Sequence, residues 1–115
     1  PSILPLLKEF NVKGMAHITG GGIQGNLCRI LPANCDAHIN TDAWKVPAIF
    51  RLIQREGKIE EKEMFKVFNM GIGLVLVVSK NEMGKISTQL SSSGEVVFPI
   101  GEITSGKGQV VLKGI

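Results

Sequence analysis

A run of glycines beside a histidine is the part of this sequence best suited to chemistry. The segment HITGGGIQG, from His17 to Gly25, follows an apolar stretch and precedes a helix-like one. Glycine loses the most freedom on folding, so three in succession indicate a backbone that turns tightly or closely approaches a ligand. Free N–H groups between a strand and a helix bind anions, most often phosphates. We predict an anion site at Gly20, Gly21 and Gly22 with the Thr19 hydroxyl as a further donor; a turn without ligand is the alternative.

His17 ends the strand that leads into these glycines. Its imidazole could bind a substrate or transfer a proton near neutral pH, and a core histidine is the alternative. Gly20, Gly22 and Gly25 match the G-x-G-x-x-G spacing, but Asp42 is a poor candidate for the acidic residue that dinucleotide binding requires. The Gly-Lys-Ser/Thr of a nucleoside triphosphate loop is absent as well. Neither familiar nucleotide motif fits.

A second glycine-containing turn, FNMGIG, spans Phe68 to Gly73 just before the most apolar stretch of the chain. Asn69 carries both a donor and an acceptor, and Gly71 keeps its surroundings open. The alternative is a turn with a bulge. The candidate metal ligands are Cys28, Cys35 and His38. They are poorly suited to a structural zinc site, which needs four well-spaced ligands. We predict no metal site.

The elements that must position these residues alternate irregularly. Helices are expected at Ser2–Phe10, from Ile23 to Pro32, from Pro47 to Gly57, at Glu60–Val67 and from Asn81 toward Leu90, and strands at Val12–Ile18, Ile72–Val78, Glu95–Ile103 and Gln109–Ile115. This order lacks a regular βαβ repeat. It predicts an α+β fold, layered, with a mixed sheet and packed helices, in a single domain over residues 1–115.

Bulk composition narrows the class of protein. The 115 residues are 43% hydrophobic, and the net charge of +3 comes from basic residues scattered along the chain with few aromatics. Nucleic-acid binders cluster their Lys and Arg, so we expect no nucleic-acid partner. The longest apolar run is far too short to cross a bilayer, and two cysteines make no disulfide framework. No membrane segment and a cytoplasmic location are expected.

Taken together, the motifs resemble a known family. The segments GMAHITGGGIQGNLCRILP, WKVPAIFRLIQREG, EMFKVFNMGIGLVLVV and GEVVFPIGEI, in this order, are similar to the second half of aminoimidazole ribonucleotide synthetases, the phosphoribosylformylglycinamidine cyclo-ligases of purine biosynthesis. The similarity covers nearly the whole chain. One departure concerns the segment after the glycines, where family members commonly read E-N-I/L-P-R and this chain has Gly25, Asn26, Leu27, Cys28 and Arg29. A carboxylate role at position 25 is therefore in doubt.

The resemblance implies the carboxy-terminal domain of a two-domain, homodimeric enzyme that uses ATP and magnesium. Such an enzyme closes the ring of formylglycinamidine ribonucleotide to give aminoimidazole ribonucleotide, ADP and phosphate. The amino-terminal ATP-binding and dimerisation domain is expected to lie outside this chain, which would be inactive alone. The family motifs place substrate or phosphate contacts on Thr19, Gly20, Gly21, Gly22, Asn26, Asn69 and Gly71, and a catalytic role on His17. The alternative is a stand-alone phosphate-binding or interaction module of the same superfamily.

Overall fold

The computed structural model describes residues 3–115. In chain order the elements are α1 (Ile3–Glu9), β1 (Val12–His17), α2 (Gly22–Cys28), β2 (Cys35–Asn40), α3 (Ala48–Gly57), α4 (Glu61–Val67), β3 (Leu74–Val78), the 3₁₀ turn η1 (Lys80–Glu82), α5 (Met83–Ser92), β4 (Gly101–Ser105) and β5 (Val110–Lys113). Ser2 and the side chains of Ile3 and Leu6, on which part of the predicted first helix rests, lie outside the described part. Within the described residues, no helix is long and apolar enough to span a membrane.

Two compact units make up the chain. Of the described residues, the first unit contains 3–15 and 76–99, and the second contains 16–75 and 100–115. Their boundary falls inside β1 and β3, which pair with each other in a two-stranded sheet. Both glycine turns lie in the second unit.

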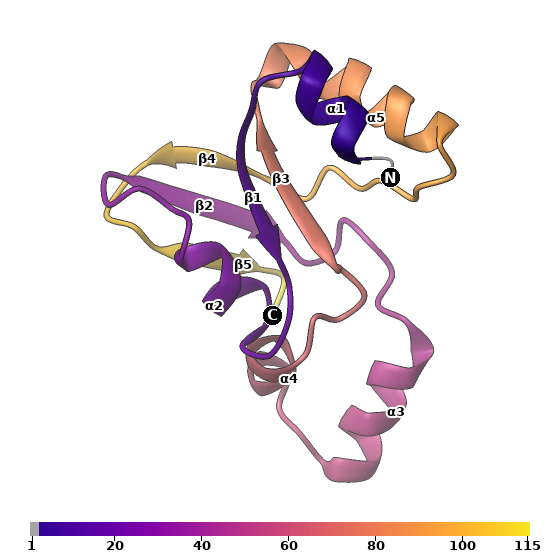
Figure 1. The fold of residues 1–115 in the computed structure, drawn as a ribbon. Coiled ribbons are helices and arrows are strands. Elements are labelled where there is room, and N and C mark those ends of the chain that lie inside the picture. Colours follow the sequence, from indigo (N-terminus) through magenta and orange to yellow (C-terminus); the bar gives the residue numbers. More distant parts are fainter. Residues whose placement is uncertain (1–2) are drawn as a thin grey trace. The chain divides into compact units, whose positions relative to one another are not determined.

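The sheet of the second unit has the strand order β4-β2-β5 (Figure 1). β2 pairs antiparallel with β4, so that His38 faces Glu102, and parallel with β5, so that Asn40 faces Lys113. A sheet that combines both directions confirms the predicted α+β class with a mixed sheet. Alternate side chains of β2 point to opposite sides, and Ala37 and Ile39 are its buried positions.

The core of the second unit forms where α2 packs against α4 and β5. Ile23 and Leu27 lie four residues apart on one face of α2, and both are buried. Met64 and Phe65 of α4 and Val110 of β5 complete this core and are buried as well. The helical spacing read from the sequence thus identified the buried face of α2.

A smaller core lies within the first unit. Ile86 and Leu90 are buried there on one face of α5, against Phe10, Val12, Leu76, Val78 and Val97. α1 also packs against α5. The helix predicted from Asn81 toward Leu90 is confirmed, although its first residues form η1 instead of α-helix.

Three element predictions need correction. β2, at Cys35–Asn40, was not predicted, because CDAHIN has few of the β-branched residues typical of strands. The predicted strand at Glu95–Ile103 begins only at Gly101, since the residues before it make no ladder. The helix predicted to run to Pro32 ends at Cys28.

Candidate functional site

The first glycine turn connects β1 to α2 in the second unit. Gly21 and Gly22 have φ of 101° and 67°, the left-handed region that glycine adopts without strain. The Gly22 N–H donates to the Thr19 carbonyl at 3.1 Å, whereas no hydrogen bond within residues 3–115 uses the N–H of Gly20 or Gly21. A Cβ built on Gly20 would have no neighbour within 4 Å. Gly20 and Gly21 are both exposed, so the turn has two solvent-accessible residues whose N–H groups have no partner among residues 3–115.

The side chain of Asn26 lies beneath this turn. It is 6% exposed, and its Nδ2 donates to the carbonyl oxygens of Gly22, Thr19 and Gly20 at 2.8, 3.3 and 3.4 Å. Its Oδ1 accepts the Thr19 hydroxyl at 3.3 Å. Both polar groups of the Asn26 amide are thus engaged by the turn.

The second turn, after α4, is held by Asn69, Met70 and Gly71. Asn69 Oδ1 accepts the Gly71 N–H at 2.9 Å, and Gly71 has a φ of 99°. Met70 is buried with φ at 54°, an unusual value for a residue with a side chain. Trp44 donates from Nε1 to the Met70 carbonyl at 3.0 Å, and a Cβ on Gly71 would come within 2.5 Å of Pro47. The buried Trp44 is thus a packing anchor for the second turn.

The structure brings the two turns into direct contact within the second unit. The Ile18 N–H donates to the Gly73 carbonyl at 2.8 Å. A Cβ on Gly22 would overlap the Phe65 carbonyl oxygen and approach that of Phe68 to 3.1 Å. Only glycine at this position allows α4 to pack so closely against the first turn. Two motifs about fifty residues apart in sequence therefore form one surface.

His17 is exposed at the end of β1, immediately before the first turn. The alternative of a histidine buried in the core is therefore wrong. Thr19 and Gly20 are exposed beside it, and Asn69 is half-buried in the second turn. Asn69 has no hydrogen bond from its Nδ2 among the described residues, so this donor remains available.

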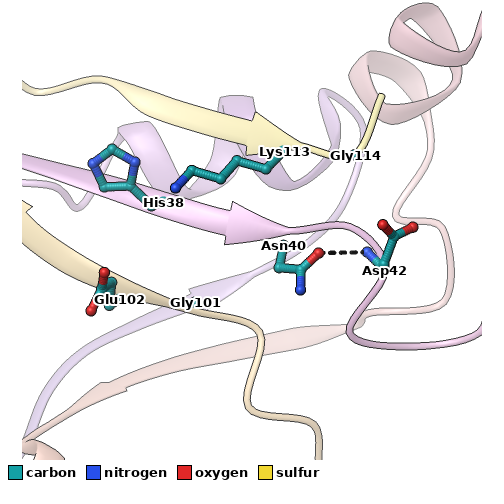
Figure 2. Close-up of a pocket in the computed structure, with 7 residues that line it drawn as sticks. All are labelled: His38, Asn40, Asp42, Gly101, Glu102, Lys113 and Gly114. Atoms are coloured by element: carbon teal, nitrogen blue, oxygen red, sulfur yellow. Dashed lines mark hydrogen bonds between the residues drawn. The ribbon is translucent and has the colours of Figure 1, made fainter.

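A polar depression of about 530 Å³ lies on the face of the β4-β2-β5 sheet that carries the alternate positions of β2. His38, Asn40, Asp42, Gly101, Glu102, Lys113 and Gly114 line it, and Figure 2 shows Lys113 extending toward the His38 ring. His38 Nε2 lies 3.1 Å from the Thr104 hydroxyl, and its Nδ1 is buried with no hydrogen-bond partner among residues 3–115. Sequence reasoning did not find this depression, because β2 was not recognised as a strand.

The charges of the lining residues and the solvent accessibility of His38 determine which ligands this depression could bind. Its lining combines one lysine and one histidine with two carboxylates, so it favours no charge sign. The buried Nδ1 of His38 has no surface that a ligand atom could touch. The depression is therefore a weaker candidate than the glycine turns.

The loop between β4 and β5 is organised by Asp36. Its Oδ1 accepts the backbone N–H groups of Gln109 and Lys107 at 2.9 and 2.8 Å. These two hydrogen bonds, with a smaller contribution from nearby His38, hold the pKa of Asp36 below its ordinary value. Asp36 is thus a structural anchor of the loop.

Metal ligands do not gather in the described part of the chain. Within residues 3–115, no three His, Cys, Asp or Glu side chains are arranged to hold a metal ion. Cys28 is exposed and Cys35 half-buried, and both are free thiols.

Comparison of the sequence with known proteins identifies the family of this chain. Residues 2–113 match the family model described as AIR synthase related protein, C-terminal domain. The chain belongs to this family. The phosphoribosylformylglycinamidine cyclo-ligase of Citrifermentans bemidjiense is 53% identical over 102 residues, which cover 89% of this chain and 29% of that protein. The protein of the same name from Thermoanaerobacter sp. (strain X514) is 51% identical over 106 residues, covering 92% and 32%. The resemblance inferred from the motifs is confirmed.

A solved structure supports the fold of this AIR synthase related domain. The crystal structure of thiamine-monophosphate kinase from Stenotrophomonas maltophilia aligns with a TM-score of 0.69 over 94% of this chain and 33% of that one, at 16% identity. At this identity the likeness concerns the fold alone. The chain spans less than a third of the length of these cyclo-ligase relatives.

Proposed function

We propose that this chain is the substrate-side part of an ATP-dependent cyclo-ligase of purine biosynthesis. The reaction is ring closure of formylglycinamidine ribonucleotide to aminoimidazole ribonucleotide, with ADP and phosphate as the other products. The observation that carries the proposal is the contact between the two glycine turns, together with the N–H groups of the exposed Gly20 and Gly21, which have no partner among residues 3–115. Identity of about half to proteins named cyclo-ligases supports the choice of reaction.

The substrate carries a ribose phosphate, and the first turn suits a phosphate. Backbone N–H groups of Gly20 and Gly21 would donate to its oxygens. The Thr19 hydroxyl, which donates to Asn26 Oδ1 at 3.3 Å, would become a third donor only by leaving that bond. Gly22 allows the turn to form against α4, which a side chain there would prevent. Asn69 would contribute its free Nδ2, and Gly71 would keep the second turn close to Pro47.

His17 is the candidate for proton transfer. In the proposed reaction ATP phosphorylates the formyl oxygen, and the neighbouring amine then attacks the formyl carbon. The attacking nitrogen must lose a proton, and an exposed imidazole beside the phosphate-binding turn could accept it. His17 is therefore proposed as the general base.

ATP and magnesium are assigned mainly to the part of the relatives that this chain does not match. The first turn fits one phosphate, but the described residues offer no set of ligands that fits a magnesium ion. We accordingly derive no step through magnesium from this chain. A homodimeric full-length enzyme in the cytoplasm belongs to the same proposal.

The alternative is a stand-alone phosphate-binding module. Such a module should present polar surfaces, whereas part of a larger enzyme should expose an apolar face. Ile49 and Leu52 of α3 are 57% and 43% exposed, and α3 has no buried residue. In Figure 1, α3 lies away from the β4-β2-β5 sheet. This exposed apolar side favours the cyclo-ligase proposal.

A chimera tests the function directly. This chain would replace the matching segment of the Citrifermentans bemidjiense cyclo-ligase, and ATP-dependent formation of aminoimidazole ribonucleotide would be measured. We expect turnover from the chimera and a loss of at least about 100-fold with His17→Ala, the usual scale of general base catalysis. His38→Ala, at the other histidine, is the matched control and should retain activity. A folded but inactive chimera would contradict the proposed function.

A further inference from the structure

Asn26 was expected to contact the ligand, but its geometry assigns it a different task. Its Nδ2 has two hydrogens, and three carbonyl oxygens of the turn lie within 3.4 Å of that nitrogen. Its Oδ1 accepts the Thr19 hydroxyl at 3.3 Å. With 6% of its surface exposed and its Nδ2 bonded to turn carbonyls, Asn26 has no free donor among the described residues to offer an anion. It acts on the turn alone.

Without such a side chain the Gly20 carbonyl would have no donor among residues 3–115, and the Thr19 carbonyl would keep only the Gly22 N–H. Carbonyl oxygens repel an anion, and N–H groups attract it. Asn26 engages the carbonyls of Thr19, Gly20 and Gly22 on the buried side, while the N–H groups of Gly20 and Gly21 stay unbonded. The two kinds of backbone group are thus separated onto opposite sides of the turn.

We infer that Asn26 is a positioning residue that makes the exposed side of the first turn donor-only and so selects anions, without touching them. This inference rests on the proposed function for the identity of the anion, but not for the conformation of the turn. Asn69 is the contrasting case, because its Oδ1 receives one hydrogen bond while its Nδ2 has no partner within the described part of the chain. Asn69 can therefore contact a ligand directly, and Asn26 cannot.

The substitution Asn26→Asp tests this inference with little change in shape. A carboxylate placed where Nδ2 lies 2.8 Å from the Gly22 oxygen cannot donate and repels the turn carbonyls. Burial among carbonyls raises the pKa of such an aspartate, so that lowering the pH restores a protonated oxygen that can donate. The turn of Asn26→Asp should therefore recover between about pH 7.5 and pH 4.5. Asn81→Asp introduces the same charge at an exposed position and is the matched control.

The probe is inorganic sulfate, which stays doubly charged over this pH range. It would be titrated into the ¹⁵N-labelled 115-residue chain while the amide signals of Gly20 and Gly21 are followed. We expect Asn26→Asp to bind sulfate about tenfold more weakly than wild type at pH 7.5, since one charge-sensitive hydrogen bond is lost, and to recover at pH 4.5. Asn81→Asp should stay within about twofold of wild type at both pH values.

Each outcome is decisive. A folded Asn26→Asp with wild-type sulfate affinity and unchanged Gly20 and Gly21 signals at pH 7.5 overturns the inference. If wild type binds no sulfate, the phosphate role in the proposed function fails, and the Gly20 and Gly21 shifts in Asn26→Asp still decide the role of Asn26. If Asn26→Asp does not fold, Asn26→Ser, which keeps one hydroxyl donor without charge, replaces it. Slow hydrogen exchange of the Asn26 side-chain amide in wild type is also required, and fast exchange refutes the inference.

Discussion

Adding one methyl group at each of the three consecutive glycines should have three different effects on stability. At Gly22 the new Cβ overlaps the Phe65 carbonyl oxygen, and φ is +67°. At Gly21 φ is +101°, but the nearest atom, Asn26 Nδ2, is 3.9 Å away. At Gly20 nothing lies within 4 Å and φ is outside the left-handed region. Gly22→Ala therefore combines steric overlap with backbone strain, Gly21→Ala introduces backbone strain alone, and Gly20→Ala introduces neither.

The magnitudes follow from these geometries. A left-handed φ costs a residue with a Cβ about 1–2 kcal/mol, which is the whole effect expected for Gly21→Ala. Gly22→Ala adds an overlap with backbone that must move, about 1–3 kcal/mol more, so its total is about 2–5 kcal/mol. Gly20→Ala should be neutral or stabilising by up to about 1 kcal/mol, because alanine restricts the unfolded chain.

Urea unfolding followed by tryptophan fluorescence measures these differences. Trp44 is the only tryptophan and lies 6.2 Å from Phe65 between ring centroids, so it reports on the region that Gly22→Ala disturbs. The expected order of destabilisation is Gly22→Ala, then Gly21→Ala, then Gly20→Ala. A Gly22→Ala variant as stable as Gly20→Ala would refute the close packing of α4 on the first turn. If Gly20→Ala keeps its stability but loses sulfate binding, glycine at this position serves the ligand.

Three further predictions concern other parts of the molecule. Because the native fold lowers the pKa of Asp36, this carboxylate stabilises the protein fully above its ordinary value of 3.8 and progressively less as the pH falls below it. Asp36→Asn should therefore lower the urea midpoint at pH 7, and its difference from wild type should close in acid. Trp44→Phe removes the donor to the buried Met70 carbonyl and should cost about 1–3 kcal/mol in urea unfolding followed by circular dichroism. Ile49→Lys, at a residue 57% exposed, should reduce self-association in light scattering without lowering the urea midpoint.

Each of these three variants has its own control or its own result that would contradict the prediction. Asp42→Asn should keep the acid dependence of wild type, and an Asp36→Asn variant that keeps it as well would contradict the role of Asp36. For Trp44→Phe, an unchanged urea midpoint would mean that the Met70 carbonyl needs no partner. Val96→Lys, at a residue 79% exposed outside α3, is the control for Ile49→Lys. Equal effects of the two lysines on self-association would show that α3 has no special role.

Local patterns in the sequence predicted most helices and the position of both turns. Ile23 and Leu27, four residues apart, identified the buried face of α2 because helical periodicity is a local property. Pro47 marked the start of α3 correctly, since proline fits the first turn of a helix. The predicted end of this helix at Gly57 is correct as well, and Lys58, the residue after it, takes the left-handed conformation with φ at 52°.

Tertiary contacts decided what local patterns could not. β2 is a strand because β4 and β5 pair with both its edges, although its own residues have weak strand propensity. The depression lined by His38 and Lys113 consequently could not be predicted. The role of Asn26 could not be predicted either, because an asparagine side chain can bind a ligand as well as it can bind the backbone of a turn.

By itself the sequence determined the family, the α+β class and the two glycine turns, because these depend on motifs and periodicities that neighbouring residues carry. Only the tertiary structure decided that the turns touch, that His17 is exposed and that Asn26 is buried beneath the first turn. Each of these properties depends on residues far apart in the chain, such as Ile18 and Gly73, whose hydrogen bond forms only after folding has brought them together.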